Sequence, residues 1–202
     1  MSYEEFLDSE MKSSLSKFFS RWFGLYGKKP RVMFYSRRLY SVCLKHTSHP
    51  CFDEIFEFPD TFHSWWLKTI LHVWFSTCRL NLCSAETEAL SKELFSLFLD
   101  DIEHRLLLLG INSDIFVIRM TKEYYKLSVC LMCSLDKGIL GTDCELSSVL
   151  WEHVFSSTCT VEALASMVKY IRSELQYLDS QNENDILQGR VYFRLPLPAL
   201  YL

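Results

Sequence analysis

Apolar residues recur every three or four positions along almost the whole chain, a spacing that predicts α-helices. Ser2 with Glu5 forms a capping-box pattern at the start of a first helix. The apolar face of that helix would contain Leu7, Met11, Leu15, Phe18 and Trp22. Two glycines and Pro30 should end it, and a second helix is expected over residues 31–45.

A third helix should begin at an Asp60 cap, run to Asn81 and lie at the centre of the core, because it is apolar on nearly every side. A fourth is expected from a Ser84 cap to Leu109. Gly110 follows in the position of a left-handed stop.

The fifth helix should begin at Ser113 and end before a turn at residues 136–138, Asp-Lys-Gly. Thr142 with Glu145 repeats the capping-box pattern and opens a sixth helix. Thr160 caps the last long one. Its buried side would contain Leu164, Val168, Ile171, Leu175 and Leu178.

After Ser180 the helical spacing is lost, and the run VYFRL alternates like a short extended segment. The pattern therefore predicts an all-α fold, a single compact bundle-like domain of about seven helices with a short extended C-terminal tail. We divide the chain into an N-terminal helix and linker at 1–30, the helical domain at 31–195 and a tail at 196–202.

Composition supports this picture. The 202 residues are 49% hydrophobic and 15% aromatic, with only six glycines and five prolines. The most apolar run, Trp65 to Cys83, still contains Lys68, His72 and Arg79, so no segment is expected to span a bilayer. Eight cysteines at irregular spacings are typical of reduced thiols, and we expect most of them in the core.

Charge is distributed unevenly along the chain. Residues 11–52 contain nine Lys or Arg and no Asp or Glu, and aromatic residues are interleaved with these cations. This mixture suits a phosphate-bearing surface such as RNA or an anionic membrane. The alternative is a basic helix face that is only solvated or paired with the acidic remainder of the chain.

Two cysteine patterns have the spacing of possible sites. Cys130 and Cys133 form a CxxC, but it falls inside a predicted helix instead of at a helix start, which favours two core cysteines. Four zinc-capable side chains lie within nine residues: Cys43, His46, His49 and Cys51. Structural zinc sites usually take ligands from two separated segments, so we expect no metal here.

Other catalytic patterns fail. No phosphate-binding loop, nucleophile elbow, zinc-protease or di-iron spacing is complete, so no catalytic residue and no cofactor is predicted. The alternative function is a metal-dependent or thiol enzyme on a helical scaffold, using the Cys43 to Cys51 cluster.

The most distinctive run is DTFHSWWLKTILHVW, which contains Trp65, Trp66, His72 and Trp74. Most of it should be core, with the histidine bound to a neighbouring hydroxyl or carbonyl. Amphipathic aromatics of this kind would also suit a groove that binds a partner helix.

This run resembles the signature of the ubiquinol-cytochrome c chaperone family, the mitochondrial assembly factors of respiratory complex III. The likeness continues in order over about residues 31–195. The further blocks are DDIEHRLLLLGIN, the pair Tyr124 and Tyr125, DKGIL, SSVLWEHVF and VKYIRSELQYLDSQNENDIL.

The resemblance implies a non-catalytic assembly factor on the matrix side of the inner mitochondrial membrane, peripheral or soluble, with no DNA partner. It further implies a small partner protein, newly made cytochrome b and the mitochondrial ribosome as partners. Phosphates of ribosomal RNA or of anionic lipid would attract the basic segment. Residues 11–29 are basic, contain serine and lack acids, as a mitochondrial presequence does, whereas the first ten residues contain four acids.

Two surfaces are therefore expected to make contacts. One is aromatic and contains Trp65, Trp66, His72 and Trp74. The other is basic and contains Lys28, Lys29, Arg31, Arg37 and Arg38. The segment that holds Cys130 and Cys133 is about one helical turn longer than the family pattern, so local contacts there should differ.

Overall fold

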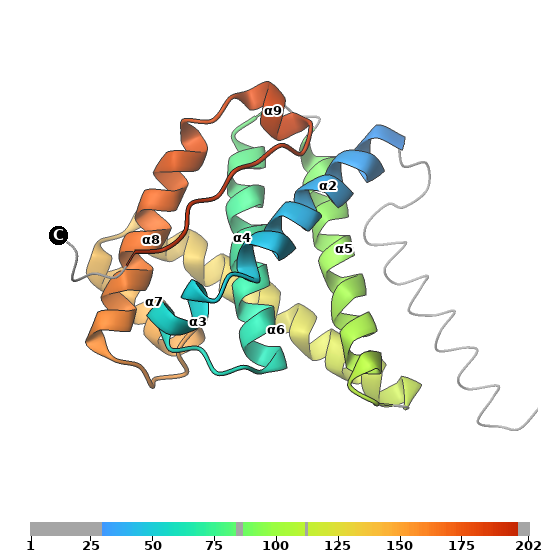
Figure 1. Cartoon of the computed structure of the whole chain (residues 1–202), viewed down its shortest axis with the longest axis horizontal. Helices are drawn as coiled ribbons and strands as arrows, with labels where there is room; N and C mark the ends of the chain where they lie inside the picture. Colours follow the sequence, from blue (N-terminus) through green and yellow to red (C-terminus); the bar gives the residue numbers. More distant parts are fainter. Residues whose placement is uncertain (1–29, 84–86, 112, 198–202) are drawn as a thin grey trace, which may run out of the picture.

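Eight α-helices and no strand occur in residues 30–83, 87–111 and 113–197, which the computed structural model describes (Figure 1). The helices are α2 (Pro30–Thr47), α3 (Cys51–Phe56), α4 (Phe62–Asn81), α5 (Thr87–Leu108), α6 (Asp114–Leu140), α7 (Asp143–His153), α8 (Val161–Asp179) and α9 (Glu183–Leu187). The all-α prediction is confirmed. The helix predicted near residues 2–22 lies outside the described residues. The short helices α3 and α9 were not predicted.

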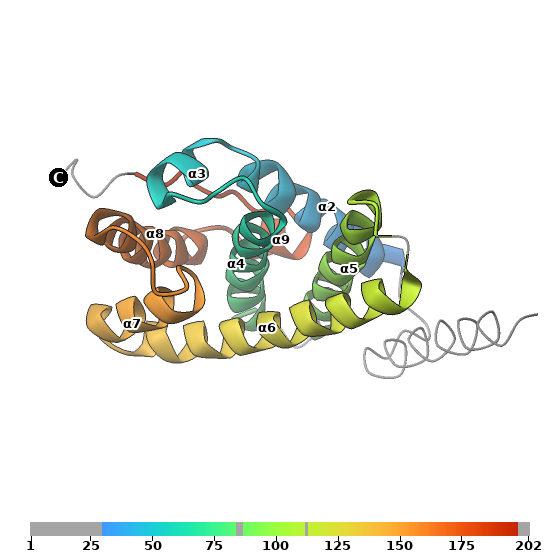
Figure 2. The ribbon, with the colours of Figure 1, turned by 90° about the horizontal axis from the view of Figure 1, so that it is seen from below.

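The helices form three layers (Figure 2). The long α6 and the shorter α7 form one outer layer, while α4, α5 and α8 form the middle. Helices α2 and α3 cover the opposite side, together with the C-terminal segment. Helix α4 packs against α2, α5, α6 and α8, so the prediction of a central third helix is confirmed.

Helix α4 is central because its sequence has apolar or internally bonded residues on every side. Fully or almost fully buried side chains come from consecutive positions, 69–76, with no polar stripe left for solvent. A helix of this kind is stable only inside a core. The remaining helices bury one face each against it or against its neighbours.

Most helix starts follow the predicted caps. The hydroxyls of Ser113, Thr142 and Thr160 each accept a hydrogen bond from the main-chain N–H three residues on, and Thr142 completes a capping box with Glu145. Gly110 has φ of 81°, the left-handed stop that was predicted. The cap of α4, however, is the residue after Asp60, so that prediction was wrong by one position. Thr61 has extended backbone and its hydroxyl accepts from the N–H of Ser64 at 3.2 Å. Ser84 lies outside the described residues.

The predicted turn at residues 136–138 is wrong, because α6 continues through it to Leu140. Tertiary contacts override the local signal. The carboxylate of Asp136 accepts a hydrogen bond from the indole Nε1 of Trp74 at 2.8 Å. Gly138 is buried against α7, where an added Cβ would lie 3.2 Å from the side chain of Leu146. Glycine here permits close helix packing instead of a turn.

The cysteines are free thiols, but most are not core residues. Cys43 is buried, four others are half-buried, and Cys130, Cys133 and Cys144 are exposed. The CxxC does lie inside a helix, yet on the solvent side of α6, so the prediction of two core cysteines was wrong. The outer face of this long helix is covered by no other described element.

The C-terminal segment is extended over residues 190–197, but it pairs with no described strand. It passes between α8 and α2 (Figure 1). Its side chains alternate as predicted from Val191, which is buried, through exposed Tyr192 and partly buried Phe193 to exposed Arg194. The alternation ends there, because Leu195 is exposed as well. None of the described helices is long and apolar enough to cross a bilayer.

Candidate functional site

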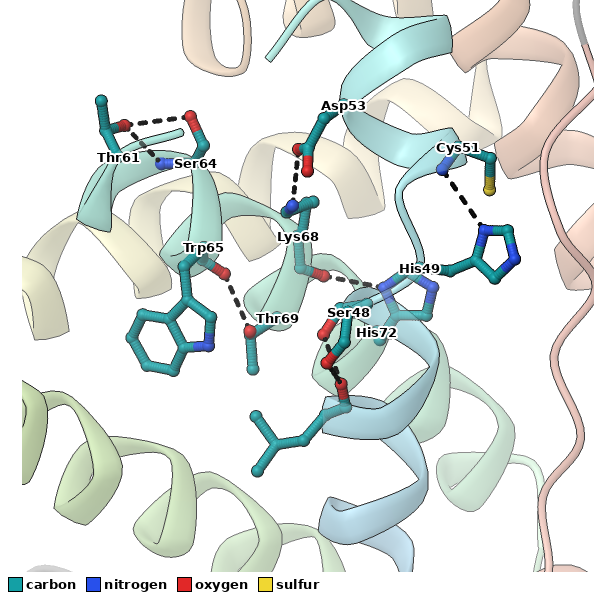
Figure 3. Close-up of polar contacts among 12 residues, drawn as sticks. Ser48, His49, Cys51, Asp53, Thr61, Ser64, Trp65, Lys68, Thr69 and His72 are labelled. Carbon is teal, nitrogen blue, oxygen red and sulfur yellow. Dashed lines mark hydrogen bonds and ion pairs between the residues drawn. The ribbon is translucent and has the colours of Figure 1, made fainter. Parts of the chain in front are cut away.

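His72 of α4 is completely buried and both of its ring nitrogens are hydrogen-bonded, one of them to the main chain of Lys68 (Figure 3). Its Nδ1 lies 2.7 Å from the carbonyl oxygen of Lys68, and its Nε2 lies 2.8 Å from the hydroxyl of Tyr170. A carbonyl oxygen only accepts, so Nδ1 carries the proton and Nε2 accepts from the tyrosine. The prediction that a neighbouring hydroxyl or carbonyl binds this histidine is confirmed, with one of each.

Two of the three tryptophans in the same run are also internal. Trp66 and Trp74 are 2% and 1% exposed. The indole Nε1 of Trp66 donates to the hydroxyl of Ser128 at 3.0 Å, and that of Trp74 donates to Asp136. Both partners belong to α6, so these bonds fix α4 onto the long outer helix. The aromatic contact surface therefore needs revision, since Trp66, His72 and Trp74 are not accessible to a partner.

Trp65 is the half-buried member of the set, and it faces α5. The guanidinium of Arg105 lies over its ring at 4.1 Å, a cation–π contact. Arg105 also pairs with Asp101 at 3.2 Å, and Asp101 accepts the hydroxyl hydrogen bond of Tyr40 at 2.8 Å. These contacts join α4, α5 and α2. One face of the Trp65 ring is therefore already covered by Arg105 of the same chain.

Burial sets the protonation of the histidines next to this core. Desolvation lowers the pKa of His72 to about 3, with a smaller contribution from the charge of His46. Desolvation also lowers the pKa of His46 to about 4. The two rings lie 5.1 Å apart. Both histidines are therefore neutral near pH 7 and act as hydrogen-bonding groups.

The four side chains proposed as a metal set do not come together. Cys43 is buried at 0% exposure inside the core, and burial raises the pKa of its thiol to about 12. The Nε2 of His46 is directed to the main-chain carbonyl of Arg194 at 3.1 Å. His49 Nδ1 accepts from the N–H of Cys51 at 3.3 Å (Figure 3). Across 30–83, 87–111 and 113–197, no three His, Cys, Asp or Glu side chains are arranged to hold a metal ion.

The basic surface is better supported by its placement. Arg31, Arg37 and Arg38 are exposed on α2, a helix that contains no acidic residue. Its opposite face buries Leu39 and Cys43 against α4 and α5. The cations are thus held on the outside by an amphipathic helix. Lys28 and Lys29 lie outside the described residues.

A buried carboxylate was missed by sequence reasoning. Glu174 of α8 is 0% exposed, and desolvation raises its pKa to about 7. Its Oε1 accepts from the main-chain N–H of Arg194 at 3.1 Å. Its Oε2 lies 3.5 Å from the Arg194 Nε. The signal was present, because Glu174 falls between Ile171 and Leu178 at helical spacing, on the face predicted to be buried.

A second missed feature is an apolar corner where α5 meets α6. Exposed apolar side chains come from the end of one helix and the start of the next: Leu107, Leu108, Leu109, Ile115 and Phe116. The first three belong to the run DDIEHRLLLLGIN, in which the sequence pattern indicated a family resemblance but no exposed apolar surface. Exposed apolar patches are typical of interaction surfaces.

Comparisons with known proteins agree on one family. The model of the ubiquinol-cytochrome C chaperone family matches residues 54–193. Ubiquinol-cytochrome c reductase complex assembly factor 1 from Mus musculus is 32% identical over 174 residues, which cover 82% of this chain and 57% of that protein. The Homo sapiens protein of the same name is also 32% identical, with 82% and 56% covered. The chain thus spans somewhat more than half the length of these relatives.

More distant relatives extend the comparison. The mitochondrial protein CBP3 of Saccharomyces cerevisiae is 25% identical to this chain. The matched region covers 72% of this chain and 44% of the yeast protein. The crystal structure of the Cbp3 homolog from Brucella abortus superposes with a TM-score of 0.64 at 18% identity. The superposed region covers 79% of this chain and 88% of the Brucella abortus chain, so the two proteins share the same fold. Given the family match and the relatives at 32% identity, this chain belongs to the ubiquinol-cytochrome c chaperone family.

Proposed function

We propose that this chain acts in mitochondria as a non-catalytic assembly chaperone for ubiquinol-cytochrome c reductase, respiratory complex III. The observation that carries the proposal is the family match over residues 54–193, since the relatives are named as assembly factors of this complex. The interior gives no support to the alternative of a metal-dependent or thiol enzyme. The buried histidines and Cys43 are used in packing and hydrogen bonds, and Cys43, His46, His49 and Cys51 do not converge.

We further propose that it binds newly synthesised cytochrome b on the matrix side of the inner membrane, together with a small partner protein, at or near the mitochondrial ribosome. The cationic face of α2 supports contact with phosphates, because Arg31, Arg37 and Arg38 are exposed and have no acidic residue on their own helix. Either ribosomal RNA or anionic lipid headgroups would supply such phosphates.

The test is affinity purification of the tagged full-length protein from its own mitochondria, with mass spectrometry of the proteins that co-purify. We expect cytochrome b, a small protein in stoichiometric amount and proteins of the large ribosomal subunit. Deletion of the protein should lower complex III while the other respiratory complexes assemble normally at first. Normal complex III after deletion would contradict the proposal.

A further inference from the structure

Side chains of the bundle hold the main chain of the extended C-terminal segment. Residues 190–197 cross between α8 and α2 (Figure 1) and pair with no described strand. The main-chain polar groups of Tyr192 and Arg194 are bound instead by three side chains from earlier in the chain, those of Gln181, Glu174 and His46. We call the space bounded by these three residues the tail groove.

The contacts fall on alternate residues of the segment. Gln181 binds both main-chain groups of Tyr192: its Nε2 donates to the carbonyl at 2.6 Å and its Oε1 accepts from the N–H at 3.0 Å. Two residues on, the N–H of Arg194 donates to Glu174 at 3.1 Å, and its carbonyl accepts from His46 at 3.1 Å. The main-chain groups of both residues are therefore satisfied by side chains of the groove.

The intervening residues direct their side chains toward the bundle. Val191 is 3% exposed. The ring of Phe193 lies 5.0 Å from that of His72 and 5.3 Å from that of His46. Main-chain hydrogen bonds to an extended segment, with pockets for alternate side chains, are how proteins recognise peptides with broad sequence tolerance.

The side chains of the segment add a small set of contacts to those of its main chain. Val191, Phe193 and Pro196 pack inward, while Tyr192, Leu195 and Leu197 are 63%, 44% and 66% exposed. The guanidinium of Arg194 lies over the ring of Tyr177 at 4.4 Å and 3.5 Å from Glu174. Burial of Val191 and Phe193 is worth about 1.5–3 kcal/mol each at most. If the segment left, Glu174 and His46 would lose their main-chain partners, so the groove is more stable occupied than empty.

We infer that the tail groove is a binding site for an extended polypeptide. Its own C-terminal segment occupies it in place of an extended client segment that has bulky apolar residues at alternate positions. The requirement for main-chain groups and two apolar side chains suits a polypeptide that has not yet folded. The inference rests on the proposed function only where it calls this polypeptide a client.

The cis segment competes strongly, because a linked ligand acts at an effective concentration on the order of millimolar. A peptide should therefore bind the full-length chain weakly until the tail is displaced. The test uses a fluorescent peptide of residues 190–197, RVYFRLPL, and a full-length double variant, Val191→Asp with Phe193→Asp, whose own tail cannot seat. Binding is followed by fluorescence anisotropy.

We expect the double variant to bind this peptide at least tenfold more tightly than the unaltered chain does. A peptide with the same two aspartates is the matched control and should not bind. Addition of Gln181→Ala to the double variant should weaken binding again. A folded double variant that binds neither peptide, or both equally, would overturn the inference.

If the double variant does not fold, the unaltered full-length chain still decides the question. A peptide with photoreactive benzoyl-phenylalanine in place of its phenylalanine is added in large excess and irradiated. Crosslinks should map to the residues around Phe193, which include His46 and His72. Crosslinks elsewhere or none would refute the inference. Because neither experiment involves complex III, their failure leaves the proposed function standing, and normal complex III after deletion leaves peptide binding standing.

Discussion

The hydroxyl of Tyr170 donates a hydrogen bond to the imidazole Nε2 of His72 across 98 residues of sequence, at 2.8 Å. The tyrosine is 3% exposed and the histidine 0%, so neither group has water as a substitute partner. The bond joins the central helix α4 to α8. Burial also raises the pKa of Tyr170 well above its usual value, which keeps this hydroxyl protonated and able to donate.

Removal of one partner of this pair should destabilise the fold by more than the loss of one hydrogen bond, because the other partner is left buried without a hydrogen bond. His72→Phe strands the hydroxyl of Tyr170, and Tyr170→Phe strands the unprotonated nitrogen of His72. Each should lower the free energy of unfolding by about 1–3 kcal/mol. The double variant should cost less than the sum of the two, by about 1 kcal/mol, because neither polar group of the pair is then left without its partner. Urea denaturation of the four proteins measures the coupling, and strictly additive costs would contradict it.

Ionisation of Glu174 should make stability depend on pH in a defined direction. Burial raises its pKa in the folded chain from 4.5 to about 7. Between these values the folded chain binds a proton that the unfolded chain has released. The stabilisation is therefore full below pH 4.5 and is lost as pH rises to about 7, by about 3 kcal/mol. Glu174→Gln should lack this loss.

The control for this prediction is built into the comparison. His46 and His72 have lowered pKa values, so their contribution has the opposite sign: stability falls as pH drops below about 6.5. Both proteins share that effect, and the difference between them isolates Glu174. The free energy of unfolding at pH 5 and at pH 8 would be measured for each. A difference between the two proteins that stays constant with pH would show that Glu174 is not perturbed.

Two glycines provide a matched pair for backbone effects. Gly110 and Gly189 both have positive φ, 81° and 70°. An alanine Cβ at Gly110 would meet nothing within 4 Å, whereas at Gly189 it would strike the carbonyl oxygen of Tyr35. Gly110→Ala should cost about 1 kcal/mol from the strained φ alone. Gly189→Ala should cost about 3 kcal/mol, since overpacking adds to the strain. Equal shifts in the urea midpoint would disprove the close approach.

Charge reversal on α2 should weaken attachment to phosphate-bearing particles. Arg37→Glu with Arg38→Glu changes the charge of an exposed face without touching the core. At about 1 kcal/mol per cation near an anionic surface, association should fall at least tenfold. Sedimentation with mitochondrial ribosomes and with anionic vesicles measures it and tells the two apart. The matched control is Arg119→Glu with Lys122→Glu, an equal charge change on exposed positions of α6. Loss with the control alone would locate the contact elsewhere.

The periodic pattern determined most of the architecture. The long helices from α2 to α8, the capping box of Thr142 with Glu145 and the stop at Gly110 were all predictable from sequence. These features depend on neighbours three or four positions away, which the sequence displays directly. The family also followed from sequence alone, through collinear blocks that begin in the tryptophan-rich run.

Long-range contacts decided the rest. The turn predicted at 136–138 became helix because Asp136 binds Trp74 from another element and Gly138 packs under α7. The CxxC was predicted to be core, but no described helix covers that side of α6. Local signals of a few tenths to about 1 kcal/mol per residue are easily outweighed by such contacts.

The candidate sites divide in the same way. That α2 would be cationic was evident from composition, and that His72 would be internally bonded was predictable from its apolar helix. Which helix face is buried, and which residues meet across the chain, is set by the packing of all helices together. The sequence therefore determined the elements, the charge and the family. Only the tertiary structure decided that Trp66 and Trp74 are internal while Trp65 is half-buried, and that Gln181, Glu174 and His46 converge on one extended segment.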